Sequence, residues 1–196
     1  TGPVLERAIA SVLTQTANVE LILVNNGNTP DVETQLIQRF KDEPLVRVMT
    51  GHGNIGSARA RNLGARVAKG DAFLFLGPNC ILQPDAVARL HKLAGELKRP
   101  YAVGARIVDE HKRDVPEARQ TLLTPWTALA RLIGLEALFP HLGDVGLTPV
   151  PKVLSKVPSI SGHFLFVPRA DFMRVRGFDD GYFLGPIAMD FCTRLT

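Results

Sequence analysis

The sequence predicts an α/β protein with three layers, α/β/α, around a mostly parallel central sheet. Short apolar segments such as LILV and FLFL alternate with longer segments in which apolar residues recur every three or four positions. The apolar segments end in turns that are rich in Gly, Asn or Pro. Strands that alternate with amphipathic helices usually form a parallel sheet that helices cover on both faces.

The first half of the chain has the clearest alternation. Residues 1–16 predict a helix, because a proline stands near their start and Leu5, Ile9 and Val12 fall on one stripe. The next elements are a strand at 19–24, a helix at 31–40, a strand at 45–49, a helix that ends near residue 68, a strand at 72–76 and a helix from residue 84. The ordered pattern continues through YAVGARIVD at 101–109.

The second half is less regular. Residues 110–158 are rich in proline and contain one amphipathic stretch, 126–139, which we expect to pack on the core. SISGHFLFVP predicts a strand at 159–168, and DFCTRL begins a helix at 190. The chain starts at a helix with no strand before it and stops without a Gly or Pro to end its last helix. We therefore expect a single domain over 1–196 that is truncated at both ends.

Composition and charge narrow the classes of function. With 45% hydrophobic and 21% charged residues, the chain has no apolar run near the roughly 18 residues of a membrane span. The two cysteines form no CxxC pair and no signal-like segment opens the chain, so we expect reduced thiols and a cytoplasmic location. A net charge of +4 with scattered Lys and Arg suits a phosphate-bearing ligand or peripheral contact with an anionic inner membrane face, and argues against nucleic acid.

Ligands of open parallel sheets bind at the turns that follow the strands. Here those turns and their surroundings read SVLTQTANVELILVNNGNTP, NIGSARARNLGARVAKGDAFLFL, PDAV, SGHFLFVPR, and RGFDDGYFL followed by DFCTRL. In this order they resemble the family 2 glycosyltransferases of the GT-A fold over nearly the whole chain. The resemblance implies sugar transfer from a nucleotide-diphosphate donor to a saccharide or lipid-linked acceptor hydroxyl, usually with inversion and usually with Mg²⁺ or Mn²⁺. It also implies a nucleotide-binding half, 1–109, and an acceptor-side half, 110–196.

The resemblance assigns nucleotide binding to the first turn. Asn25, with Asn26 beside it, stands where the family usually has a carboxylate that pairs with the base. An amide both donates and accepts, so base recognition can survive this replacement.

The second turn is assigned to the phosphates. Asn54 and Asn62 flank a helix start, where backbone N–H groups and either Arg59 or Arg61 are candidates to meet the donor. The alternative is purely structural, because Asn, Gly and Arg at such junctions also serve as caps and solvated charges.

The metal-binding motif of the family is replaced in this sequence. The third strand usually ends in a carboxylate that holds the divalent cation, whereas this chain has Gly77, Pro78 and Asn79. Hard cations prefer anionic oxygen ligands, so Asn79 predicts weak metal binding at most. A simple turn role for Asn79 is the alternative.

The catalytic base of the family is also replaced. Its acidic pair corresponds to Ile187 and Ala188, and only the later Asp190 is kept. Two helical positions are about 200° apart, so if Ala188 faces the donor, Asp190 points nearly away from it. Asp180 and His163 are the other candidates for the base, with a capping role and a packing role as their respective alternatives.

Three other functions stay open at this point. The lost acids favour a catalytically inactive glycosyltransferase-like domain that binds a nucleotide or a partner. A Rossmann-type oxidoreductase is the rival enzyme class, although no GxGxxG follows the first strand. A purely structural scaffold is the third.

Overall fold

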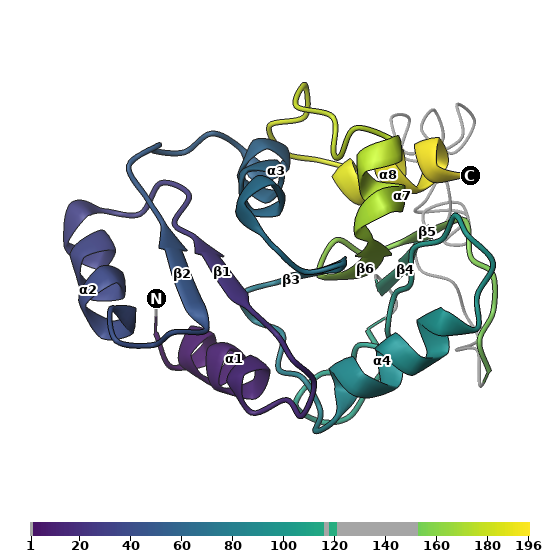
Figure 1. Ribbon diagram of the computed structural model, residues 1–196, viewed down its shortest axis with the longest axis horizontal. Coiled ribbons are helices and arrows are strands. Elements are labelled where there is room, and N and C mark those ends of the chain that lie inside the picture. Colours follow the sequence, from purple (N-terminus) through teal and green to yellow (C-terminus); the bar gives the residue numbers. More distant parts are fainter. Residues whose placement is uncertain (1, 116–117, 121–152) are drawn as a thin grey trace, which may run out of the picture.

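The computed structural model describes residues 2–115, 118–120 and 153–196 (Figure 1). The helices are α1 (Pro3–Leu13), α2 (Pro30–Phe40), α3 (Ser57–Val67), α4 (Ala86–Gly95), α7 (Arg169–Arg174) and α8 (Ile187–Leu195). Figure 1 shows α1 and α4 on one side of the strands, and α3, α7 and α8 on the other. The predicted three-layer arrangement is therefore confirmed.

The strands are β1 (Leu21–Val24), β2 (Val46–Met49), β3 (Ala72–Leu76), β4 (Arg119–Gln120), β5 (Ser159–Ile160) and β6 (Phe164–Pro168). β1 and β2 are parallel, as a strand–helix–strand unit requires, with Leu21 opposite Val46. β6 runs antiparallel to β3, with Ala72 opposite Pro168, and β4 and β5 are also antiparallel. Parallel neighbours are usually joined by a single crossover helix. β3 and β6 are not joined in this way, since β4 and β5 come between them in the chain, so they can pair in antiparallel fashion.

The segment expected as one strand at 159–168 is divided into β5 and β6 by a turn. In that turn the Ser161 hydroxyl accepts a hydrogen bond from the His163 N–H at 3.2 Å. The His163 carbonyl in turn accepts from the Gly77 N–H at 2.8 Å, which ties the turn to the end of β3. The break matters because it turns His163 out of the sheet at a strand end.

The core has two parts because helices cover both faces of β6. Successive side chains of a strand point to opposite faces. Leu165 and Val167 are fully buried against apolar residues of α3, α7 and α8. Phe164 and Phe166 pack on the other face against α1 and α4. The strand that begins directly after His163 is therefore packed on both of its faces.

Two further expectations concern the middle of the chain. Within 101–109 the structure has isolated bridges, Val103 to Phe166 and Val108 to Asp114, and no continuous strand. The amphipathic stretch 126–139 lies outside the described residues. Among the helices that are described, none has the length and apolar character needed to cross a membrane.

Candidate functional site

A cavity of about 380 Å³ opens where α3, the turn between β5 and β6, and the start of α8 meet. Its walls are Ser57 and Arg61 of α3, residues 161–163 of the turn, and residues 184–189 before and within α8. These segments are far apart in the sequence. The packing of α3, α7 and α8 over one face of the strands brings them together (Figure 1).

Gly56 holds one wall of the cavity in place. The Ser57 N–H donates to the Phe183 carbonyl at 2.9 Å, which fixes the 181–186 loop against the start of α3. A Cβ atom on Gly56 would lie 2.8 Å from the Phe183 ring, and the φ angle of Gly56 is +83°. Both the close approach and the left-handed backbone require glycine here.

Arg61 supplies a positive charge to the cavity. Its guanidinium carbon lies 5.6 Å from the centre of the Phe178 ring, and a Cβ atom on Gly162 would lie 2.7 Å from its Nη1 atom. Across residues 2–115, 118–120 and 153–196, no carboxylate forms an ion pair with Arg61. Burial lowers the pKa of Arg61, but an arginine stays protonated at neutral pH. The cavity therefore contains a fixed cation without a protein counter-ion in the described chain.

The rest of the cavity also favours an anion. None of the lining residues that the structure describes is acidic. Ala188 and Met189 belong to the first turn of α8, and their N–H groups have no acceptor in the part of the chain that the structure describes. Free N–H groups and the positive end of the helix dipole stabilise negative charge at such a start. Together with Arg61 they make this an anion-binding environment.

The turns that follow β1 and β2 meet beside the start of α3. The Asn26 amide donates to the Asn54 side-chain oxygen at 3.2 Å, and the Ile55 N–H donates to the Asn26 oxygen at 3.0 Å. Asn54 also accepts from the Gly56 N–H at 3.1 Å. Two of the sequence-predicted asparagines thus form one cluster next to the cavity wall.

Asn25 is buried beneath this cluster. Its amide nitrogen donates to Glu33 of α2 at 3.2 Å, and its oxygen accepts from the Asn28 amide at 2.5 Å. The side chain therefore joins the end of β1 to α2. Arg59, the other predicted residue of this region, is exposed on α3.

Asn62 is 8% exposed and connects α3 to the loop before α8. Its oxygen accepts from the Phe178 N–H at 3.0 Å, and its amide donates to the Phe178 carbonyl at 2.8 Å. The same amide donates to the Asp180 carboxylate at 2.7 Å. Both Asn62 and Asp180 are thus engaged with each other, and neither lines the cavity.

Asp190 is held by Arg194, one helical turn later in α8. The two side chains form an ion pair with a nitrogen–oxygen distance of 2.8 Å. Arg194 also donates to the carbonyls of Val175 and Gly177. Asp190 is not among the residues that line the cavity, whereas Ala188 is. The two positions diverge as expected for residues that are about 200° apart on a helix.

His163 lies between the cavity and the end of β3. It lines the cavity, and a Cβ atom on Gly77 would lie only 2.6 Å from its Nδ1 atom. The same Cβ atom would be 3.1 Å from the Asn79 side-chain oxygen. The imidazole therefore fills the space next to Gly77, and Asn79 lies on the same side.

Comparison with known proteins identifies the family. The sequence model described as "Glycosyl transferase family 2" matches residues 2–145. The chain belongs to glycosyl transferase family 2. The N-acetylglucosaminyl-diphospho-decaprenol L-rhamnosyltransferase of Mycobacterium tuberculosis is 28% identical over 99% of this chain and 66% of its own length. The rhamnosyltransferase WbbL of Escherichia coli is 25% identical over 89% of this chain and 70% of its own length.

Solved structures support the same fold for this family 2 chain. GalNAc-T7 with UDP, GalNAc and Mn²⁺ has a TM-score of 0.62 and 19% identity, over 98% of this chain and 37% of that one. The mannosyltransferase PcManGT of Pyrobaculum calidifontis, in complex with GDP-Man and Mn²⁺, has a TM-score of 0.66 and 14% identity, over 100% of this chain and 48% of that one. The expected GT-A fold is confirmed.

The family 2 metal site does not fit the residues that this chain provides. Gly77 has no side chain, the side chain of Pro78 has no donor atom, and Asn79 offers one neutral amide oxygen. Within the described ranges, no three His, Cys, Asp or Glu residues gather in a way that could hold a metal ion. A divalent cation needs several oxygen ligands, preferably anionic ones.

The family 2 sequence pattern did not predict some residues of the cavity. Ser57 and Gly162 gave no signal of their own, and Arg61 was only an alternative to Arg59. No local signal separates the two arginines, since each lies between two buried residues, and only the packed chain exposes Arg59. The close packing of Gly162 on Arg61 depends on two segments about 100 residues apart and has no local signature.

Proposed function

We propose that this chain transfers a sugar from a nucleotide-diphosphate donor to an acceptor hydroxyl, with inversion at the anomeric carbon. The observation that carries the proposal is the cavity formed by α3, the 161–163 turn and the start of α8 in a family 2 chain. Its cation and N–H groups, which have no partner among the described residues, suit the diphosphate of such a donor. The asparagine cluster of Asn26 and Asn54 adjoins it on the nucleotide side.

The donor and the acceptor meet at the cavity in this proposal. Residues 1–109 bind the nucleotide, with Asn25 and Asn26 near the base and Asn54 near the start of α3. Residues 110–196 contribute the acceptor side through the loop before α8. Asn62 positions that loop, because both ends of its amide are bound to residues 178 and 180.

The proton of the acceptor hydroxyl is the weak point of the reaction. Asp190 is paired with Arg194 and Asp180 accepts from Asn62, so neither carboxylate is free to act in the cavity. His163 adjoins Gly77, in the 77–79 turn that the resemblance assigns to the metal motif, and thus lies on the leaving-group side of the donor. Ala188 occupies the acceptor side but cannot accept a proton. We therefore expect slow transfer, since a positioned base contributes roughly 10²- to 10⁴-fold.

The acceptor is proposed to be a lipid-linked sugar, and the first donor to test is nucleotide-linked L-rhamnose. Two relatives are named as rhamnosyltransferases, and the name of the mycobacterial one describes a sugar on a diphospho-decaprenol. Phe183 and Leu184 are 53% and 74% exposed, and Leu184 lines the cavity. Exposed apolar side chains at its mouth suit the lipid part of such an acceptor and contact with the inner membrane face.

The test is product formation, measured by mass spectrometry over a panel of donors and acceptors. Ala188→Asp should raise transfer by about tenfold or more, because it places a carboxylate on the cavity wall. Ala188→Asn, of the same size but without basicity, is the matched control and should give no gain. Nucleotide affinity should stay nearly constant in Ala188→Asn, whereas the carboxylate of Ala188→Asp lies beside the anion-binding N–H groups and should lower it.

Two outcomes would contradict this proposal. Binding of nucleotides with no transfer by the wild type or by Ala188→Asp would favour an inactive, nucleotide-binding domain. Fast wild-type transfer that His163→Ala or Asp180→Asn abolishes would assign the proton acceptor to the altered residue.

A further inference from the structure

The end of β3 has an unusual relation to the cavity. Gly77 begins the turn at 77–79, where the family resemblance expects the metal motif, and it is buried. A side chain there would collide with His163, since even a Cβ atom would lie 2.6 Å from Nδ1. The imidazole thus fills the space that a side chain at position 77 would need. A carboxylate at position 77 would require His163 to move.

The cavity on the other side of His163 has its own positive charge. The Arg61 guanidinium lies over the Phe178 ring, and so close to Gly162 that there is no room for a Cβ atom there. Within the described residues it forms no ion pair, and none of these residues brings an acidic side chain to the cavity wall. A cation that loses hydration without gaining a protein anion costs free energy, which an anionic ligand would recover.

We propose that Arg61 replaces the divalent cation in this chain, so that the cavity binds a diphosphate group without a metal ion. This inference rests on the proposed function, because that function supplies the diphosphate. Arg61 provides two N–H groups in a fixed geometry that matches phosphate oxygens. The free N–H groups of Ala188 and Met189 add donors at the start of α8. His163 separates this site from the neutral remnant of the metal motif.

Calorimetric binding of UDP, dTDP, GDP and inorganic pyrophosphate tests this directly. Each probe is titrated into the purified chain, once with EDTA and once as its preformed Mn²⁺ complex. We expect the dissociation constants with and without Mn²⁺ to agree within about twofold for the probes that bind, because the protein offers the metal no anionic ligand.

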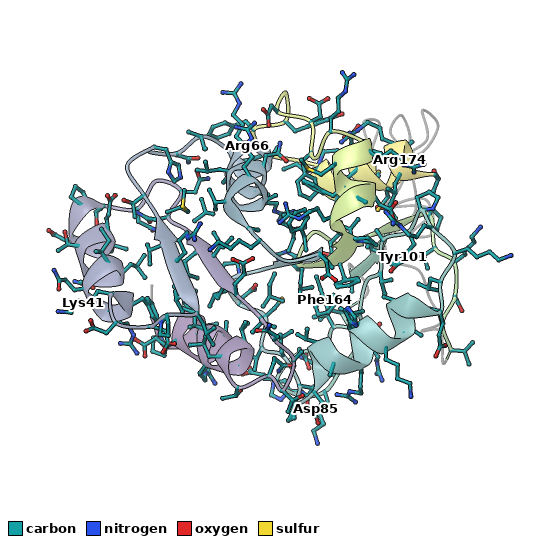
Figure 2. All side chains as sticks on the ribbon, viewed as in Figure 1. Lys41, Arg66, Asp85, Tyr101, Phe164 and Arg174 are labelled. Atoms are coloured by element: carbon teal, nitrogen blue, oxygen red, sulfur yellow. The ribbon has the colours of Figure 1, made fainter. Side chains whose placement is uncertain are left out.

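Substitutions test the part of Arg61. Arg61→Gln should weaken binding by about tenfold or more, the fold-change that corresponds to losing a charge-assisted hydrogen bond. Arg61→Lys keeps the charge without the planar pair of donors, so its affinity should lie between those of the wild type and Arg61→Gln. Arg66→Gln is the matched control, because Arg66 is exposed on the same helix (Figure 2). This variant should bind the probes with the affinity of the wild type.

A second variant covers the case in which Arg61→Gln fails to fold. In Gly162→Ala the new Cβ atom would approach the Arg61 Nη1 and Nη2 atoms to 2.7 and 3.2 Å. The flexible end of Arg61 must then move while its charge and the fold remain. Binding should weaken in this variant too, whereas circular dichroism should be unchanged.

The outcomes separate this inference from the proposed function. Three results would overturn the metal-independent site. They are an affinity that rises about tenfold or more with Mn²⁺, unchanged binding by a folded Arg61→Gln, and no binding of any of the probes. Metal-independent binding that requires Arg61 supports it even if no sugar is transferred. In that case only the proposed transfer function fails.

Discussion

Replacing Asn62 by Ala should chiefly lower the stability of the fold and should affect donor binding only through it. The Phe178 N–H and carbonyl both depend on the Asn62 side chain, at 3.0 and 2.8 Å. Phe178 is 2% exposed, so water cannot readily replace either bond. The Asp180 carboxylate, which is exposed, loses its bond at 2.7 Å at lower cost because it can be rehydrated.

The expected loss follows from these bonds. An unsatisfied buried polar group costs about 1–3 kcal/mol, so two backbone groups give a loss of about 2–6 kcal/mol in the free energy of unfolding. That is a large part of the roughly 5–15 kcal/mol that stabilises an ordinary domain. Partial relaxation of the 178–180 loop would bring the value toward the lower end of the range.

Urea unfolding followed by far-UV circular dichroism measures this loss. Gln38→Ala is the matched control, because it removes an exposed side-chain amide from α2, and it should change stability by less than about 0.5 kcal/mol. A folded Asn62→Ala protein that keeps wild-type stability but loses nucleotide affinity would refute the structural role and restore Asn62 as a donor-binding residue.

Two further predictions concern the core. Phe178→Ala should cost about 3–5 kcal/mol in urea unfolding, because the ring contacts Phe75 and Phe191 with centroids 4.8 and 5.0 Å apart and is almost fully buried; a loss below about 1 kcal/mol would contradict the packing. Burial raises the pKa of the Cys192 thiol, so the folded state holds this proton more tightly than the unfolded state does. The contribution of this thiol to the free energy of unfolding is fully present below the unfolded-state pKa of about 8.5. It is lost as the pH rises toward and through the folded-state pKa. Cys192→Ala should flatten that alkaline decline, and an unchanged pH profile would count against it.

The candidate site could be predicted only where a sequence signal is local. The turns after β1 and β2 were recognisable from their Asn and Gly residues, and Asn26 and Asn54 do meet. The absence of acidic residues at 77–79 and 187–188 was equally plain, because it concerns residue types. The partners of Asn62, Asp180 and Asp190 were not predictable, since each depends on which neighbour the packed chain presents.

The sequence by itself determined the layers of this protein and the family to which it belongs. Periodicity of apolar residues decides which segments become strands and helices, and ordered motifs carry the resemblance along the chain. The tertiary structure alone decided that Arg61, Gly162 and Ala188 share one cavity and that His163 fills the space beside Gly77. Local patterns cannot encode these contacts, because each joins segments that approach only when α3 and α8 pack against the same face of the strands.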